Sequence, residues 1–275
     1  MGLITQLRLP LAPDRGSPLG VNELLLLVAG LLGGAVNTLA GGGSFIVFPA
    51  LLAVGVPPVL ANASNTYAAL PGYVSGAYGL RAQMMAQKHL FLPYGLVAVI
   101  FGYIGAELLL RVSDAQFSLV VPWLMLFAVV LFAFGGQLNA FVAARAGGSR
   151  GAKAAGAILL YLLLAGVSIY GGFFNAGLGV LLLAFLTLAG IANIHAANGL
   201  KLYISALIAL VAVIRFAIAG SIDWYHGSIA LIGVTTGAYV AARLATRIPT
   251  KIIRALVLVY GAGLTLYFFW QTYAA

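Results

Sequence analysis

The sequence predicts an all-α polytopic membrane protein whose roughly ten helical segments form two five-segment repeats of inverted topology. Hydrophobic residues make up 63% of the chain and charged residues only 7%, which leaves too little polar surface to cover a water-soluble globule. Stretches such as 119–134 are apolar on every side, whereas the strands of a membrane β-barrel alternate apolar and polar residues. A glycine-broken, asparagine-containing segment also occurs twice, 136 positions apart, as in transporters built from repeats.

Ten apolar segments lie between polar, glycine or proline breaks. Most have the length of a membrane-spanning helix, which needs about 20 apolar residues. Segments 45–55 and 178–190 are shorter, and they occupy matching places in the two halves. We therefore expect these two to be either re-entrant half-helices or strongly kinked spans. The predicted segments cover residues 21–39, 45–55, 60–80, 90–110, 115–137, 154–174, 178–190, 195–219, 226–246 and 250–271.

The duplicated segment divides the chain into two halves. Residues 29–43 recur as residues 165–179, where Leu178 interrupts the second glycine run. Five segments are an odd number of crossings, so the second copy is expected to enter from the opposite side, related to the first by an axis in the membrane plane. Exchange of conformations between the copies would give two packings, one open to each side. The predicted parts are a tail over 1–20, a first repeat over 21–143, a linker over 144–154 and a second repeat over 155–275.

The first glycine run is expected to break a helix and free backbone amides. Gly42 and Gly43 precede Ser44, which is predicted to cap the next helix. The start of a helix inside protein binds anions through its N–H groups and its dipole. The alternative is that the glycines only let helices approach closely. We weigh the two evenly for residues 41–43, and we prefer packing for Gly30, Gly33 and Gly34.

Amide side chains recur at matching places in both halves. Asn62 and Asn65 lie three residues apart on one helical face, and the shift of 136 pairs Asn65 with Lys201. Such amides can donate to a bound anion, or they can join helices at about 1 kcal/mol per bond. Their duplication favours binding. The predicted substrate-binding residues are Asn37, Gly42, Gly43, Ser44, Asn62, Asn65, Thr66, Asn175, His195, Asn198, Lys201 and Ser205.

Lys201 stands within an apolar helix, where an unpaired ammonium is costly and usually faces a cavity, a partner or a substrate. The alternative to substrate contact is an ion pair with Glu107, the one acid placed well within a predicted span. Glu107 could instead lie near a membrane surface beside Arg111, one turn further on. We place substrate contact ahead of structural pairing.

The net charge of +9 is best explained by membrane orientation rather than by binding to nucleic acid. If the segments alternate in direction, most cations fall on one face, which is then cytoplasmic in a multi-pass protein of the cell (inner) membrane. Both termini are expected outside. The cytoplasmic set is Arg81, Lys88, Arg145, Arg150, Lys153, Arg243, Arg247, Lys251 and Arg254; the opposite set is Arg8, Arg15, Arg111 and Arg215.

Several classes of chemistry have no support in this sequence. The chain has no cysteine, so disulfides and thiolate ligands are excluded. No two of its histidines have metal-ligand spacing such as i, i+4, and no nucleophile elbow, phosphate loop or paired carboxylate occurs. We expect no enzyme activity, no metal, no cofactor and no nucleic-acid partner.

The run Gly30-Leu-Leu-Gly33-Gly34-Ala-Val-Asn37-Thr-Leu-Ala-Gly41-Gly42-Gly43-Ser44, followed by Pro49, Gly55, Pro57 and Ala61-Asn62, resembles the TauE/SafE family of sulfite exporters and sulfonate permeases, part of the toluenesulfonate uptake permease superfamily. Ala197-Asn198-Gly199-Leu200-Lys201, Gly220-Ser-Ile-Asp223-Trp224 and the stretch 243–254 resemble its second half. The resemblance covers nearly the whole chain. It implies a permease for small sulfur-containing anions such as sulfite, thiosulfate or organosulfonates.

The leading hypothesis is a secondary carrier for such an anion, working by alternating access of the inverted repeats. An anion channel on the same scaffold and a membrane scaffold without cargo are the alternatives. Saturable flux with counterflow would favour the carrier, and unsaturated conductance the channel. Assembly into a homo-oligomer is left open.

Overall fold

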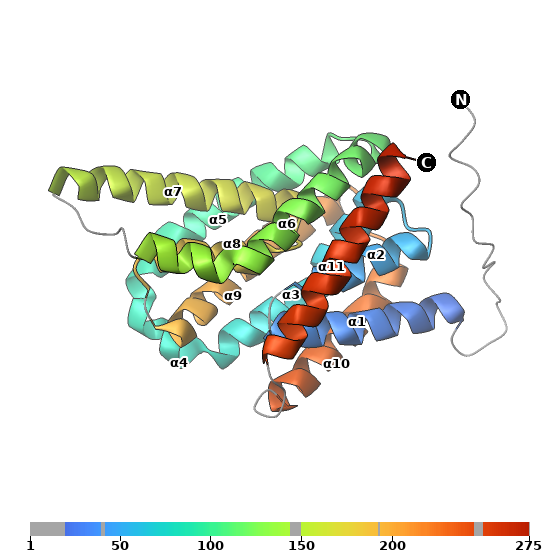
Figure 1. The fold of residues 1–275 in the computed structure, drawn as a ribbon, viewed down its shortest axis with the longest axis horizontal. Helices are drawn as coiled ribbons and strands as arrows, with labels where there is room; N and C mark the ends of the chain where they lie inside the picture. The colour runs from blue at the N-terminus through green and yellow to red at the C-terminus, as the bar shows by residue number, and fades with distance from the viewer. Residues whose placement is uncertain (1–19, 40–41, 144–149, 192, 245–249, 275) are drawn as a thin grey trace.

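The computed structural model describes residues 20–39, 42–143, 150–191, 193–244 and 250–274, and Figure 1 shows its fold. Every regular element within these ranges is a helix, which confirms the predicted all-α class. Each predicted apolar segment forms one helix, and two further short helices, α4 and the 3₁₀ helix η1, follow α3. The helices are α1 (Val21–Leu39), α2 (Ser44–Ala53), α3 (Pro58–Gly79), α4 (Arg81–Met84), η1 (Met85–Leu90), α5 (Phe91–Leu110), α6 (Asp114–Ala143), α7 (Arg150–Phe173), α8 (Leu178–Leu188), α9 (Ile194–Ile218), α10 (Trp224–Leu244) and α11 (Thr250–Tyr273).

Long apolar helices with exposed apolar side chains confirm that the chain is a polytopic membrane protein. Among the described residues, three stretches are long and apolar enough to cross a bilayer: Val21–Thr38, Arg81–Leu110 and His195–Ile218. Large apolar side chains such as Leu92 and Ile218 are exposed. Extensive exposed apolar surface is unfavourable in water and is expected where a protein faces lipid.

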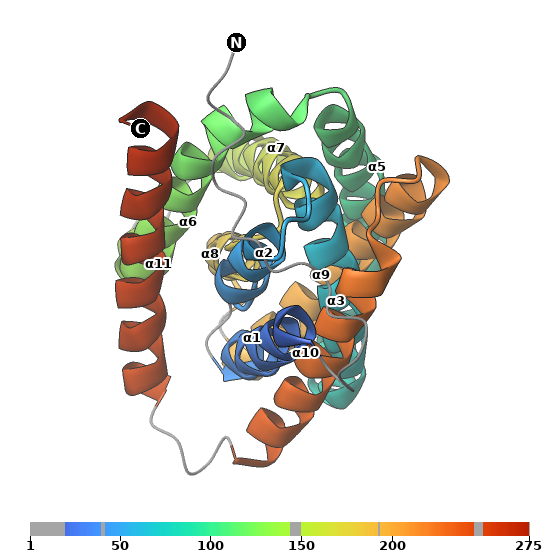
Figure 2. The same ribbon diagram turned by 90° about the vertical axis from the view of Figure 1, so that its right-hand side faces the viewer.

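The two short helices, α2 and α8, have 10 and 11 residues. At about 1.5 Å per residue, each reaches only about halfway across a hydrocarbon core of about 30 Å. Figure 1 shows them in line on opposite sides of the middle of the molecule. Figure 2, which looks along both, shows them enclosed by the longer helices. They therefore have the geometry of half-helices, one of the two forms predicted for these segments.

Both short helices end in the same backbone turn. The N–H of Val54 donates to the carbonyl of Ala50, and 135 residues later the N–H of Ala189 makes the equivalent bond. The next residues, Gly55 and Gly190, have φ of 89° and 83°, a conformation that favours glycine. The internal duplication therefore extends from residue types to backbone geometry.

Helices of one half pack against helices of the other half in matching pairs. α1 packs along α10 and α5 packs along α7, so the helix of the first segment of each half lies against that of the fourth segment of the other. Likewise α3 contacts α10 while α9 contacts α5, and the pairs α3–α9 and α6–α11 join equivalent helices. These are the pairings expected if an axis in the membrane plane exchanges the halves. The repeat boundaries at 21–143 and 155–275 stay a prediction.

Glycines bring the paired helices into close contact. A Cβ at Gly34 on α1 would overlap the carbonyl of Val234 on α10, and a Cβ at Gly30 would also meet the α10 backbone. On the other side of the molecule, a Cβ at Gly172 on α7 would overlap the carbonyl of Gly102 on α5. Small residues allow membrane helices to approach in this way. The predicted packing role of Gly30 and Gly34 is confirmed.

Some sequence predictions concern parts of the chain that the structure does not describe. These are residues 1–19 of the predicted tail, residues 144–149 of the predicted linker, Gly41, and the orientation assignments of Arg8, Arg15, Arg145 and Arg247. The side chains of Arg150, Lys153, Arg243, Lys251 and Arg254 also lie outside the described set.

Candidate functional site

The first glycine break turns the chain from α1 into α2. Gly42 has φ of 108°, and its carbonyl accepts a hydrogen bond from the N–H of Phe45 at 3.0 Å. The helix consequently begins at Ser44, with Gly43 as its N-cap. The prediction that Ser44 caps this helix is wrong, because the glycine turn starts the helix one residue earlier. Ser44 instead lies buried in the first helical turn.

α1 packs tightly against this break. A Cβ at Gly33 would come within 3.0 Å of the carbonyl oxygen of Gly43. A Cβ at Gly43 would overlap the carbonyl of Gly33 and lie 2.8 Å from the Cβ of Asn37. The packing role predicted for Gly33 is confirmed, and Gly43 serves packing as well.

A small cavity lies at the start of α2, between α1, α2, α3 and α10. Its volume of about 10 Å³ leaves room for about one water molecule. Asn65 is 2% exposed, and its Nδ2 has no hydrogen-bond partner among the described residues. Four of the predicted binding residues meet here. The cavity is lined by Gly33, Asn37, Gly43, Ser44, Val47, Asn65, Ala69 and Val234.

The second break separates α7 from α8, and it lies beside the first turns of α2. Phe174 within the break packs edge-to-face on Phe48 of α2, with ring centroids 5.6 Å apart. Gly177 has φ of 80° and is the N-cap of α8. The chain thus places the starts of the two half-helices near each other. Both helix dipoles then present their positive ends to the middle of the protein.

α3 holds the second break by two side chains on one helical face. Asn62 donates from Nδ2 to the carbonyl of Phe173 at 2.8 Å, and the Tyr73 hydroxyl donates to Oδ1 of Asn175 at 3.1 Å. Asn62 therefore joins helices, which is the structural alternative to substrate binding given above for these amides. Oδ1 of Asn62 and Nδ2 of Asn175 have no hydrogen-bond partner within the described chain.

Lys201 lies in α9 beside the start of α8. It is 9% exposed, and its stem atoms Cδ and Cε lie 3.6 and 4.0 Å from the position of a Cβ on Gly179. These distances are ordinary van der Waals contacts, so the lysine stem lies directly against the first turn of α8. One turn further on, Ser205 is completely buried, and its hydroxyl has no partner in the described part of the chain.

The alternative ion pair between Lys201 and Glu107 is wrong. Glu107 accepts from Nε of Arg215 at 2.7 Å and from Nε of Arg111 at 3.2 Å. These two arginines lie at the ends of α9 and α5, so Glu107 belongs to a cluster near one surface. Their convergence agrees with their assignment to the same face. Lys201 has no carboxylate within ion-pair distance among the described residues.

The backbone fixes how the two halves correspond at these side chains. The N–H of Ala61 donates to the carbonyl of Pro57 in the first turn of α3, and the N–H of Ala197 makes the same bond 136 residues later in α9. In this register Asn65 corresponds to Lys201. Each lies beside the start of the half-helix of its own half, so an amide in one copy is replaced by an ammonium in the other.

The remaining predicted residues are less central. The Thr66 hydroxyl donates to the carbonyl of Asn62 in its own helix, and Gly42 serves the turn. Asn198 is half-buried. His195 is exposed in the first turn of α9, where its N–H donates to the capping Asn193. His195 therefore lies exposed at the start of α9.

Sequence inspection missed three polar residues around the second break. Tyr73 binds Asn175, the Tyr170 hydroxyl donates to the carbonyl of Ala176 at 2.7 Å, and buried Ser168 has an unpartnered hydroxyl in the described chain. Tyr73 follows Asn62 by three helical turns, and that spacing is a usable signal. Tyr170 and Ser168 stand in an apolar run and give no comparable signal.

Two half-length helices begin at glycine breaks inside a ring of longer helices, and these longer helices form matching pairs between the two halves. This arrangement defines a membrane transporter of the inverted-repeat class. The sequence model of the sulfite exporter TauE/SafE family matches residues 26–268. The chain belongs to this family.

Similar curated proteins carry transporter names. A "Probable membrane transporter protein" of Haemophilus influenzae is 28% identical over 253 residues, which is 90% of this chain and 94% of the relative. The "Probable membrane transporter protein YfcA" of Escherichia coli is 27% identical over 86% of each chain. The "Probable membrane transporter protein ORF9" of a Sinorhizobium species is 27% identical over 88% of this chain and 90% of its own. No solved structure matches this chain significantly.

Proposed function

We propose that this transporter is a secondary carrier for small sulfur-containing anions such as sulfite, thiosulfate or organosulfonates. The main support is Lys201, a buried cation beside a half-helix start without a carboxylate within ion-pair distance in the described chain. A buried charge is costly unless it is compensated. A bound anion would provide that compensation in the loaded state.

The site is proposed to have two unequal halves. The first half offers amides and a hydroxyl from Asn37, Ser44 and Asn65, which line one cavity. The second offers Lys201 with Ser205 one turn away. An oxyanion accepts several hydrogen bonds, and bonds with a charged donor are the stronger ones. The lysine half would therefore supply most of the affinity, and the amide half would orient the anion.

The unpartnered atoms support the same site. Leaving a buried polar group without a hydrogen bond costs about 1–3 kcal/mol. Nδ2 of Asn65 and the hydroxyl of Ser205 are two such groups. Their bonds with substrate oxygens would recover part of this cost when the anion binds.

The size of the cavity favours a carrier over a channel. About 10 Å³ holds about one water molecule, so an anion the size of sulfite needs a rearrangement to enter. The structure corresponds to an occluded form under this proposal. Exchange of conformations between the halves would open the site to one side and then to the other.

The first experiment measures uptake of labelled sulfite, and of a taurine-like sulfonate, into proteoliposomes. Wild type is expected to take up at least one of them saturably, whereas Lys201→Gln loses about tenfold or more because a charged hydrogen-bond donor is removed. Lys88→Gln is the matched control, since Lys88 is exposed and distant in sequence from both breaks. Folding is checked for each variant by size-exclusion chromatography.

Two outcomes would contradict the proposal. Undiminished uptake by Lys201→Gln would show that Lys201 does not bind the substrate. Absence of flux for every sulfur anion tested, with folded wild-type protein, would refute the substrate class.

A further inference from the structure

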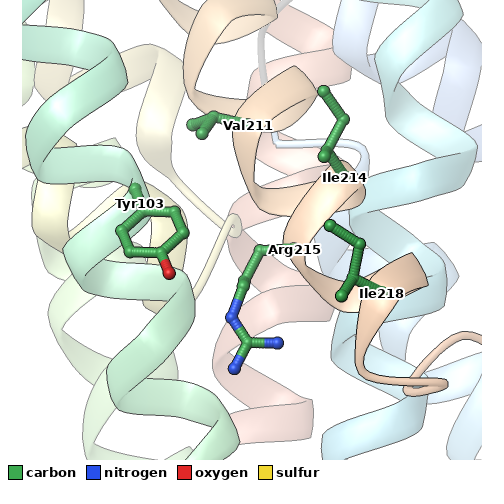
Figure 3. Close-up of a pocket in the computed structure, with 5 residues that line it drawn as sticks. All are labelled: Tyr103, Val211, Ile214, Arg215 and Ile218. Atoms are coloured by element: carbon green, nitrogen blue, oxygen red, sulfur yellow. The ribbon is translucent and has the colours of Figure 1, made fainter.

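A groove between α5 and α9 lies apart from the proposed transport site. Its volume is about 550 Å³, within the range of small-molecule sites. Figure 3 shows the side chains from both helices, with one guanidinium among otherwise mainly apolar groups. The lining residues are Tyr103, Val211, Ile214, Arg215 and Ile218.

The charged end of the groove has a surplus of positive charge. Glu107 binds both Arg215 and Arg111, so two cations share one anion and the formal sum is +1. The bond from Arg215 to Glu107 uses Nε. Figure 3 shows the two terminal nitrogens of Arg215 directed away from Val211, at the end where the Tyr103 hydroxyl also lies. The Arg215 side chain also interacts with the Tyr103 hydroxyl, and because a guanidinium has five N–H donors, the terminal nitrogens retain donors for a further acceptor.

Position along the helices matches the layers of a membrane. Arg215 lies three residues before the last residue of α9, and Arg111 directly follows the end of α5. Val211 lies one turn deeper along α9, and Ile214 is 51% exposed. Charged groups near helix ends lie at the level of lipid headgroups, whereas apolar side chains a turn deeper face acyl chains.

We propose that this groove binds an anionic phospholipid, with the phosphate at Arg215 and an acyl chain along Val211 and Ile214. Charge complementarity favours this occupant over a second copy of the chain. A symmetric contact between two copies at this groove would bring two net-positive clusters together, because a twofold interface places the same patch on both partners. A lipid phosphate brings the opposite charge.

Native mass spectrometry of the purified protein, titrated with phosphatidylglycerol and with phosphatidylcholine of the same acyl chains, tests the proposal. Wild type is expected to prefer the anionic lipid about fivefold, as one additional arginine contact allows. Arg215→Gln should lose this preference. Arg111→Gln removes the same formal charge from an exposed side chain outside the groove lining, so it should weaken the preference less than Arg215→Gln, which also removes the contact with the phosphate.

A second pair of variants leaves the ion pairs intact. Ile214→Trp fills the groove and is expected to lower anionic-lipid binding severalfold, whereas Leu210→Trp, at an exposed position outside the lining, should not. Equal binding of both lipids by wild type would overturn the proposal, as would an unchanged preference in Arg215→Gln and Ile214→Trp. A dimer that Ile214→Trp dissociates would also overturn it, because the groove would then be an interface between copies. None of these measurements depends on transport.

Discussion

Buried polar atoms without a hydrogen-bond partner recur on the helices that surround the two half-helices. The described chain has five buried side-chain atoms without a hydrogen-bond partner: Oδ1 of Asn62, Nδ2 of Asn65, Oγ of Ser168, Nδ2 of Asn175 and Oγ of Ser205. In folded proteins such atoms are rare, because each costs about 1–3 kcal/mol. These atoms lie on α3, α7, α9 and the second break, and their number supports the substrate site proposed above.

Asn65 and Asn62 permit a test of this interpretation at the level of single residues. Asn65→Leu removes an unsatisfied donor, so we expect unchanged or slightly higher thermal stability together with loss of anion uptake. Asn62→Leu removes the bond to the Phe173 carbonyl, so a loss of stability of about 1–3 kcal/mol is expected. Thermal unfolding in detergent and uptake in liposomes measure the two effects. A clear destabilisation by Asn65→Leu would show that this amide has a structural role instead.

At the scale of the helices, the close packing of the pairs α1–α10 and α5–α7 depends on glycine. On α7, Gly172 approaches the α5 backbone so closely that a Cβ would overlap the Gly102 carbonyl, whereas a Cβ at Gly166 meets nothing within 4 Å. Backbone cannot move aside as a flexible side chain can. The α5–α7 pair, like the α1–α10 pair, therefore requires glycine at its contact points.

Alanine substitutions on α7 test this requirement. Gly172→Ala is expected to cost about 1–3 kcal/mol through overpacking. Gly166→Ala should be neutral or slightly stabilising, because alanine is the better helix former and the position is open. The fraction of monodisperse protein after heating measures both. Equal stability of the two variants would contradict the role assigned to Gly172.

The sequence was sufficient to predict the elements and the packing glycines, because hydropathy and small-residue spacing are local patterns. It predicted that the segments of α2 and α8 are short and that a glycine break precedes each of them. It did not predict α4 and η1, whose residues Arg81–Leu90 look like a polar connection. The cap predicted at Ser44 is wrong because the helix begins at Ser44 itself, with Gly43 as its N-cap and no side-chain capping bond.

The candidate site was only partly predictable. Residue types alone placed Asn65 and Lys201 at matching positions, and the backbone register of α3 and α9 agrees. The partner of Asn62 was not predictable, because a backbone carbonyl 111 residues away has no signature in the sequence. The ion cluster at Glu107 likewise depends on how α5 and α9 pack.

At the scale of the whole molecule, the matching helix pairs between the two halves surround the two half-helices. Under the proposed function, this arrangement has two nearly equivalent packings, and an occluded form lies between them. The small cavity beside Asn65 corresponds to that form. A carrier of this kind must return with or without substrate before it can transport again, whereas a channel has no such step.

Counterflow in proteoliposomes measures that step most directly. Vesicles that contain wild-type protein and unlabelled sulfite should take up labelled sulfite faster than wild-type vesicles without internal sulfite. The uptake rate should saturate as the external sulfite concentration rises. Lys201→Gln should show neither the stimulation nor the saturable component. Flux that rises linearly with concentration and is unaffected by internal sulfite would contradict an alternating-access carrier with its site at Lys201.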